Sequence, residues 1–364
     1  MAQSYFVYVG TFTDARHGGK GEGVYVLRLN GATAALELVS IARGVPSPGF
    51  LAFAPDHKHL YAVNEVNEFN GKPGAALTSF VVDRTSGNLT VLNRQAEPGP
   101  GPCYVSLDKT GTWALAANYQ GGSVVMLPIL AGGKLGTPTS FVQHSGSSVN
   151  KSRQAEAHAH SIMVDPGNRF ALAADLGMDK VMVYRLDGEK GVLTPHNPSS
   201  IAIRPGAGPR HMAFHPGGRY LYVANELDST ASVIAWDATQ GKGQELSHCS
   251  TLPPDFSGVS YPAEIQLAPS GRFVYVSNRG HDSTAILAVE DGGKTLRPAG
   301  HVSTRGKWPR HFGVTPDGRI LLAANEHSDT IVSFWVDQAT GQLTPSGQMT
   351  SVPTPVCVRF MAVA

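Results

Sequence analysis

GPRHMAFHPGGRYLYVANE, residues 208–226, is the clearest copy of a pattern that recurs along this chain of 364 residues. The pattern runs from a proline through an alternating strand, a tight turn rich in glycine and proline, and a second apolar strand to a closing asparagine. Short alternating apolar runs bounded by turn residues predict β-hairpins. Each copy is therefore expected to form two adjacent antiparallel strands.

The other copies repeat this pattern at a nearly constant spacing. They are SPGFLAFAPDHKHLYAVNE (47–65), GPCYVSLDKTGTWALAANY (101–119), HAHSIMVDPGNRFALAAD (158–175), YPAEIQLAPSGRFVYVSNR (261–279), WPRHFGVTPDGRILLAANE (308–326) and the truncated TPVCVRFMAV (354–363). We call the residue that opens the first strand of each copy its anchor: Phe50, Tyr104, His160, His211, Glu264, His311 and Cys357. Successive anchors are 46 to 56 residues apart. A period near 50 residues with several short strands is typical of β-propeller blades.

Seven anchors predict an all-β fold, a seven-bladed β-propeller of four-stranded antiparallel blades. The last copy lacks its outer strands, and YFVYVGTF (5–12) matches the second strand of the pattern. Pairing of the N- and C-terminal strands would close the ring and remove two exposed sheet edges. We expect one domain over residues 1–364, with residues 131–157 as a loop over one face, either a lid or disordered. TIM-barrel and Rossmann folds are disfavoured because no segment shows the periodicity of a long amphipathic helix.

The bulk composition excludes several classes of partner. The net charge is +1, from 29 basic and 28 acidic residues, so no global field attracts nucleic acid or an anionic membrane. The start of the chain alternates like a strand and does not resemble a signal peptide, and no apolar run is long enough for a membrane span. Cys103, Cys249 and Cys357 have no CxxC spacing and do not suggest a disulfide framework. A soluble, reduced, cytoplasmic protein is expected.

The register of the repeat predicts a polar pocket. The two strands of each copy are antiparallel, so the anchor and the residue fifteen positions later should lie at the same end, at one mouth of the central channel. These pairs are Phe50/Glu65, Tyr104/Tyr119, His160/Asp175, His211/Glu226, Glu264/Arg279 and His311/Glu326, and Arg210 and Arg310 precede two of the anchors. Burying so many ionisable groups is costly unless they pair or meet a ligand.

The third copy departs from the pattern at two positions. His158 stands where six copies have proline, and Ala174 stands where five copies have asparagine. Repeated proline and asparagine serve turn geometry, so this copy is expected to be altered for another purpose. His158 and His160 would point to the same side of an extended strand. The anchor position favours His160 for chemistry, with His158 orienting it or touching the substrate.

Long ordered stretches of the chain resemble the lactonase family of seven-bladed propellers, which includes bacterial 6-phosphogluconolactonases and a fungal carboxymuconate-lactonizing enzyme. The stretches are AHAHSIMVDPGNRFALAADLGMDKV (157–181), GPRHMAFHPGGRYLYVANELDS (208–229), LPPDFSG (252–258), YPAEIQLAPSGRFVYVSNRGHDS (261–283) and WPRHFGVTPDGRILLAANE (308–326). The resemblance implies four functional residues around the channel mouth: a histidine, two arginines and a glutamate. Matched motif by motif, they are His160, Arg210, Glu226 and Arg279.

The resemblance favours hydrolysis of 6-phosphogluconolactone to 6-phosphogluconate, in the pentose phosphate pathway of carbohydrate metabolism. Either His160 or Glu226 would be the base, while Arg210 and Arg279 would hold an anionic group and stabilise the oxyanion. Substrate contacts are expected from His158, His211, Glu264, Arg310, His311 and Glu326. The partner would be a small anionic lactone.

Three alternatives remain open from the sequence. A cycloisomerase of the carboxymuconate type would close a lactone by adding a carboxylate across a double bond, and a lactonase could act on another substrate. A non-enzymatic propeller would serve as an interaction scaffold. His158, His160 and Asp175 could form a two-histidine, one-carboxylate metal site. The neighbouring arginines would repel an ion there, so no metal and no cofactor are expected.

Overall fold

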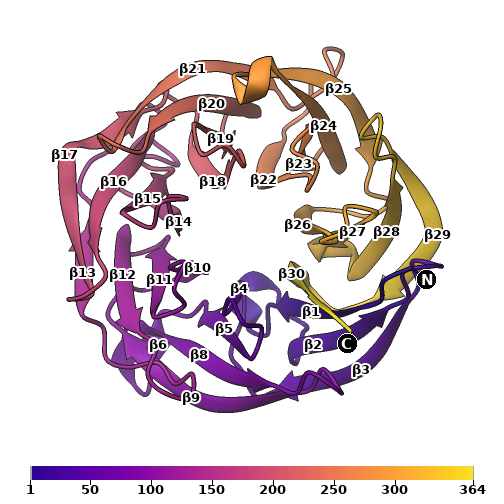
Figure 1. Ribbon diagram of the computed structural model, residues 1–364, viewed down its shortest axis with the longest axis horizontal. Helices are drawn as coiled ribbons and strands as arrows, with labels where there is room; N and C mark the ends of the chain where they lie inside the picture. The colour runs from indigo at the N-terminus through magenta and orange to yellow at the C-terminus, as the bar shows by residue number, and fades with distance from the viewer. Residues whose placement is uncertain (1, 364) are drawn as a thin grey trace.

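The computed structural model describes residues 2–363 and arranges seven four-stranded antiparallel sheets in a ring around a central channel (Figure 1). This confirms the predicted seven-bladed propeller. From the channel outward, the blades are β4 (Leu51–Phe53), β5 (His59–Asn64), β8 (Ala75–Val82), β9 (Leu89–Glu97); β10 (Pro102–Leu107), β11 (Trp113–Asn118), β12 (Ser123–Pro128), β13 (Ser140–Gln143); β14 (Ala159–Val164), β15 (Phe170–Asp175), β16 (Lys180–Asp187), β17 (Val192–Ala202); β18 (Pro209–Phe214), β19 (Tyr220–Asn225), β20 (Thr230–Asp237), β21 (Lys242–Ser250); β22 (Tyr261–Leu267), β23 (Phe273–Arg279), β24 (Ser283–Glu290), β25 (Thr295–Ser303); β26 (Pro309–Val314), β27 (Ile320–Asn325), β28 (Thr330–Val336), β29 (Leu343–Ser351); and β30 (Pro355–Ala362), β1 (Tyr5–Thr11), β2 (Gly23–Leu29), β3 (Leu36–Arg43).

The minor elements lie in the connections. A small hairpin of β6 (Glu68–Phe69) and β7 (Lys72–Pro73) lies in the connection between β5 and β8. Three short 3₁₀ helices lie in other connections: η1 (Ala15–His17), η2 (Asp291–Gly293) and η3 (Glu326–Ser328). Among residues 2–363, no helix has the length and apolar character needed to cross a membrane.

The ring closes as predicted, through strands from opposite ends of the chain. Strand β30 is the innermost strand of its blade and pairs antiparallel with β1, with Cys357 opposite Gly10 and Pro355 opposite Thr11. Both termini therefore lie on the same blade (Figure 1). This pairing covers one edge of β1 and one edge of β30 that would otherwise be exposed.

The core lies between the blades. The second strands β11, β15 and β27 are buried along their whole length, because a neighbouring blade covers each face, whereas an outer strand such as β21 is mostly exposed. Buried tyrosine hydroxyls also link blades by donating to a glycine carbonyl in a turn of the adjacent blade. These pairs are Tyr8–Gly87, Tyr61–Gly133, Tyr222–Gly293 and Tyr275–Gly341, at 2.9 to 3.1 Å. Each hydroxyl is thus satisfied at a buried position.

The turns of the repeat explain its sequence. In the second blade, Asp108 accepts hydrogen bonds from the backbone amides of Thr112 and Trp113, and Asp165 does the same for Arg169 and Phe170 in the third blade. Such side-chain-to-backbone bonds fix a tight turn without a further strand partner. The turns set where each second strand begins, and therefore which residues reach the channel mouth.

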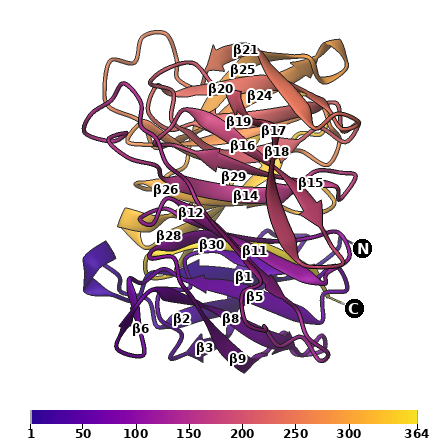
Figure 2. The ribbon, with the colours of Figure 1, turned by 90° about the vertical axis from the view of Figure 1, so that its left-hand side faces the viewer.

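The channel has one mouth on each face of the ring, and the predicted catalytic residues lie at only one of these mouths. Because the inner strand begins where the second strand ends, the connections from each outer strand to the next inner strand lie on the face with this mouth, here called the anchor face. Figure 2 shows the ring edge-on, with the β6 hairpin on this face and both termini toward the other. The segment expected as a lid or disordered loop, 131–157, instead contains β13 and most of the connection to β14, which crosses the anchor face.

The strand register corrects one prediction about the third blade. The anchors Tyr104 and His211 pair with Ala117 and Ala224, but the equivalent Ala174 pairs with Ser161. Ser161 therefore holds the anchor position, and His160 lies one residue earlier. The error arose because HAHS lacks the proline that marks the register in the other copies. The third blade consequently replaces the pattern's proline with Ala159 and its asparagine with Asp175.

Candidate functional site

A cavity of about 230 Å³ opens at the anchor-face mouth of the channel. Its lining residues come from several blades and connections: His17, Glu65, Cys103, Tyr119, Gln120, Arg153, His160, Glu226, Arg279 and Arg310. The structure thus brings together four of the predicted residues, His160, Glu226, Arg279 and Arg310, at one mouth. Arg210 lies just beneath the cavity and is 2% exposed.

Glu226 is the centre of a buried cluster of arginines. Its Oε2 accepts hydrogen bonds from Arg210 Nε at 3.0 Å and from Arg279 Nη2 at 2.8 Å, and its Oε1 accepts from Arg153 Nη2 at 2.5 Å. Burial opposes the charged form, but the three guanidinium groups outweigh it and hold the pKa of Glu226 well below its usual range. A carboxylate with both oxygens engaged in this way is a weak proton acceptor.

His160 is buried beside the thiol of Cys103. The thiol donates to the His160 carbonyl oxygen at 3.3 Å, and the Sγ–Nδ1 distance is 3.6 Å. Burial, with the nearby positive charge of Arg210, holds the pKa of His160 well below its usual value, so the imidazole is neutral at physiological pH. Burial also raises the pKa of Cys103, which remains a thiol. The site therefore combines a neutral imidazole with several fixed cations.

Arg310 has donors that the protein leaves free. Its guanidinium lies 3.9 Å from Glu65 Oε1 and 3.9 Å from Glu326 Oε2, and within residues 2–363 it makes no hydrogen bond. It stacks over Phe12, 5.0 Å from the ring centroid. His17 Nε2 lies 3.6 Å from Glu65 Oε1. Burial raises the pKa of Glu65 despite Arg310 and His17, so this carboxyl group holds a proton more readily than Glu226 does.

Three predicted substrate contacts lie deeper in the channel, below the cavity. His211 Nδ1 lies 2.6 Å from Glu264 Oε2, its Nε2 lies 3.2 Å from Arg210 Nη1, and His311 Nε2 lies 3.5 Å from the same Glu264 oxygen. Burial first, and then Arg210, holds the pKa of His211 well below its usual value. A neutral His211 therefore donates from Nδ1 to Glu264 and accepts from Arg210. This arrangement fixes the orientation of Arg210 beneath the cavity.

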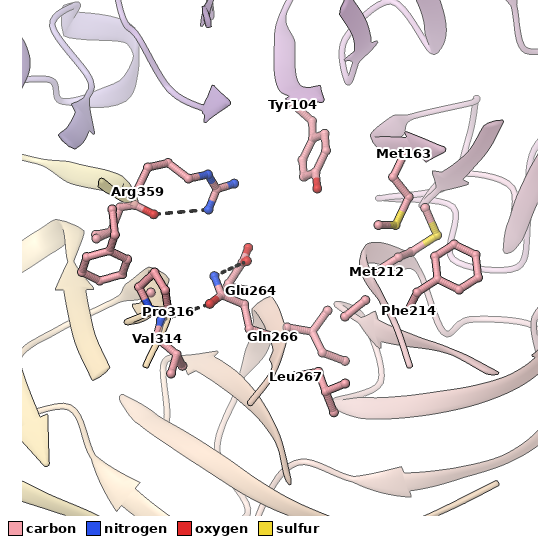
Figure 3. Close-up of a pocket in the computed structure, with 15 residues that line it drawn as sticks. Tyr104, Met163, Met212, Phe214, Glu264, Gln266, Leu267, Val314, Pro316 and Arg359 are labelled. Atoms are coloured by element: carbon pink, nitrogen blue, oxygen red, sulfur yellow. Dashed lines mark hydrogen bonds between the residues drawn. The ribbon is translucent and has the colours of Figure 1, made fainter. Parts of the chain in front are cut away.

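Glu264 also lines a second cavity, of about 440 Å³, at the opposite mouth of the channel. Figure 3 shows this cavity, where Tyr104, Glu264 and Arg359 surround an opening walled by apolar side chains such as Met163 and Phe214. Gln266 connects Glu264 to Val314 by hydrogen bonds. The polar column of His211, Glu264 and His311 thus separates the two mouths.

His158 and Asp175 serve the structure around the cavity. The His158 ring stacks on Tyr119 with centroids 4.5 Å apart, and its Nδ1 lies 2.9 Å from the Tyr119 carbonyl oxygen. Asp175 accepts from the His158 amide and, at 2.6 Å, pairs with His144 Nδ1. The side chains of the three residues considered as a metal site, His158, His160 and Asp175, therefore each contact a different group. Over residues 2–363, no cluster of three His, Cys, Asp or Glu side chains has a metal-binding arrangement.

Sequence reasoning did not select several residues of the cavity. Cys103 occupies the position before the anchor, as Arg210 and Arg310 do, so its place at the cavity could have been predicted from the repeat. Glu65 and Tyr119 stand fifteen residues after their anchors and were placed at the mouth without an assigned role. His17 and Arg153 come from connections that have no counterpart in the repeat. Only the folded chain brings those two to the cavity.

Replacing Asp175 tests why the third blade departs from the pattern. Asp175→Ala is expected to lower the free energy of unfolding by about 3 kcal/mol. The change would leave buried His144, which also contacts the Tyr184 hydroxyl at 2.5 Å, without its carboxylate partner. Urea unfolding would measure the loss, with exposed Glu189→Ala in the same blade as a control. Equal stability of Asp175→Ala and wild type would contradict this role.

The chain has extensive similarity to known proteins. A family model described as lactonase, 7-bladed β-propeller, matches residues 6–360. The 6-phosphogluconolactonase of Bacillus subtilis is 38% identical over 357 residues, which cover 98% of this chain and 98% of that protein. The 6-phosphogluconolactonase of Formosa agariphila is 31% identical over 342 residues, covering 93% and 94% of the two chains.

Comparison with solved structures also supports the seven-bladed propeller fold. The periplasmic gluconolactonase of Pseudomonas aeruginosa superposes with a TM-score of 0.91 at 33% identity, covering 99% of this chain and 100% of that chain. The agreement extends over the whole ring of blades, including the strands that carry the cavity residues. By both the family model and these relatives, the chain belongs to the lactonase family of seven-bladed β-propellers.

Proposed function

We propose that the protein is a lactonase that hydrolyses 6-phosphogluconolactone to 6-phosphogluconate. The proposal rests on a small cavity in which a neutral His160 lies close to several arginines. Some of the arginine N–H groups are free, and others hydrogen-bond to Glu226. Arg153, Arg210, Arg279 and Arg310 outnumber the nearby carboxylates Glu65, Glu226 and Glu326. This excess of positive charge favours an anionic substrate. The names of the two relatives from Bacillus subtilis and Formosa agariphila support the same substrate.

In the proposed mechanism, His160 is the general base. The Cys103 thiol donates to a backbone carbonyl, so its sulfur can accept the His160 Nδ1 proton. The Nε2 lone pair is then free to accept a proton from a water molecule in the cavity that His160 lines. Nε2 takes a proton from water as the water oxygen adds to the lactone carbonyl carbon. The ring C–O bond then breaks, and His160 returns the proton to the leaving alkoxide. The product is an open hydroxy acid.

Arg310 is the proposed oxyanion donor. Its free N–H groups face the cavity and can hydrogen-bond to the oxygen that becomes negative when water adds. Glu226 takes no proton in this scheme, because three arginines hold it as a carboxylate. Its role is to fix Arg210 and Arg279 in place. A bound anion would offset the arginine charges and make His160 a stronger base during turnover.

Hydrolysis assays with three lactones test the proposal. Freshly generated 6-phosphogluconolactone, glucono-δ-lactone and a muconolactone would be compared after subtraction of spontaneous hydrolysis. We expect kcat/KM to be largest for the phosphorylated lactone. Preferred turnover of glucono-δ-lactone would favour the activity for which the Pseudomonas aeruginosa neighbour is named. Activity on none of the three would contradict the proposed function.

A further inference from the structure

Two arginines at the rim of the cavity differ from those inside it. The side chain of Arg153 is 33% exposed, against 2% for Arg210 and 6% for Arg279. Arg16, on η1, is also exposed. We call Arg16 and Arg153 the rim arginines. Both are long cations that solvent, and therefore an entering ligand, can reach.

The rim arginines approach the same turn of the second blade. Arg153 Nη2 donates to the Tyr119 hydroxyl at 3.2 Å, and Arg16 Nη1 donates to Gln120 Oε1 at 3.4 Å. Tyr119 and Gln120 both line the cavity. Arg16 also donates from Nη2 to the Glu65 carbonyl at 2.6 Å. Two separate connections of the anchor face thus bring positive charge to one section of the rim.

Arg153 can exchange its partner without leaving Glu226 uncompensated. Glu226 keeps Arg210 and Arg279 when Arg153 turns toward a ligand. The backbone around Arg153 is held firmly, because the adjacent Gln154 is fully buried and donates to the Leu176 carbonyl at 2.9 Å. A fixed backbone with a partly exposed guanidinium is a suitable arrangement for binding an anion.

The cavity has room for only one end of a phosphorylated lactone. Ligand pockets usually enclose about 300–1,000 Å³, and this cavity is smaller, at about 230 Å³. The lactone ring fills such a volume when its carbonyl carbon lies beside His160 and Arg310. A phosphate on the exocyclic carbon would then project to the rim. Arginine forks bind phosphate oxygens in pairs, so the rim provides suitable donors.

We propose that Arg16 and Arg153 bind the substrate phosphate and so select phosphorylated over unphosphorylated sugar lactones. This inference rests on the proposed lactonase function and adds the residues that set its specificity. The inner arginines serve the reacting end of the substrate, whereas the rim arginines recognise the remote end. Selectivity then depends on two residues supplied by connections outside the repeated strands.

Selectivity of rim variants tests this division of roles. Arg16→Gln, Arg153→Gln and the double variant would be compared with wild type by kcat/KM on 6-phosphogluconolactone and on glucono-δ-lactone. The ratio of the two values is expected to fall by about 10-fold for each single change, the typical effect of losing a hydrogen bond to a charged group. Using the ratio removes any loss common to both substrates, such as weaker support of Glu226. An unchanged ratio in the double variant would overturn the inference.

A control and a binding measurement make the test independent of turnover. Arg297→Gln on β25 removes the same charge from an exposed pair with Glu290 and should leave the ratio unchanged. Calorimetric titration should show tighter binding of 6-phosphogluconate than of gluconate, and the double variant should lose that difference. If wild type hydrolysed neither lactone, the proposed function would fail, and the titration would still decide the rim assignment. Equal preference for 6-phosphogluconate in wild type and double variant would reject it.

Discussion

His160→Gln is expected to lower kcat for lactone hydrolysis by about 10²- to 10⁴-fold, the usual effect of removing a general base. Glutamine can still contact the cavity but cannot take a proton from water. The buried strand around position 160 and its backbone bond with Cys103 remain, so the fold should be retained. Steady-state assays with 6-phosphogluconolactone would measure the loss, and circular dichroism would check the fold.

His158→Gln is the matched control for this prediction. His158 is two residues away, but its ring lies against Tyr119 and does not line the cavity. Its replacement should reduce kcat far less than the replacement of His160. Near-full activity of His160→Gln, or an equal loss in both variants, would contradict the assignment of His160 as the base.

The pH profile provides a second measure of the same residue. A general base must be deprotonated, and the ordinary pKa of histidine is about 6.5. Because the pKa of His160 is held well below that value, kcat/KM should persist as pH falls through 6.5 and decline only at lower pH. The decline should be absent from the residual activity of His160→Gln. A decline centred at or above 6.5 in wild type would contradict a depressed His160 pKa.

Much of this site could be predicted because the repeat carries its geometry. The positions of Glu226 and Arg279 follow from counting fifteen residues from an anchor, and Arg210 follows from the residue before one. Antiparallel pairing through turns of fixed length makes this counting valid in the blades that carry these residues. It failed by one residue only in the third blade, where the usual proline is missing. His160 was nevertheless placed at the correct mouth, since the shift moved it by a single position.

The roles of these residues could not be read from their positions. Nothing in the repeat indicates that three arginines converge on Glu226, because Arg153 comes from the connection between β13 and β14. Without that convergence, Glu226 and His160 remained equal candidates for the base. Charge pairing distinguishes them, and it depends on distances between blades that the strand pattern does not contain. The same reason explains why His211 and Glu264 lie beneath the cavity, not at its wall.

Glu226→Gln is expected to lower both activity and stability. Removing one partner of a buried ion pair typically costs about 3–5 kcal/mol, and Glu226 compensates two buried arginines, Arg210 and Arg279. Burial, with repulsion from Arg279, already lowers the pKa of Arg210 to about 9 despite the attraction of Glu226. Loss of the carboxylate charge would leave both guanidinium groups without the anion that they share, and would weaken the contact that holds them together. Urea unfolding would measure the stability, with exposed Glu22→Gln, which loses only a surface pair with Arg43, as the control.

The activity of Glu226→Gln separates a positioning role from a role as the base. We expect kcat/KM to fall because Arg210 and Arg279 lose their fixed geometry, whereas the decline of activity toward acid pH should persist, since it belongs to His160. If Glu226 were the base, that decline would disappear in Glu226→Gln and remain in His160→Gln. The two variants therefore give opposite pH profiles under the two assignments. A carboxylate already shared by three arginines can gain a proton only by giving up those bonds, which is why the structure favours the histidine.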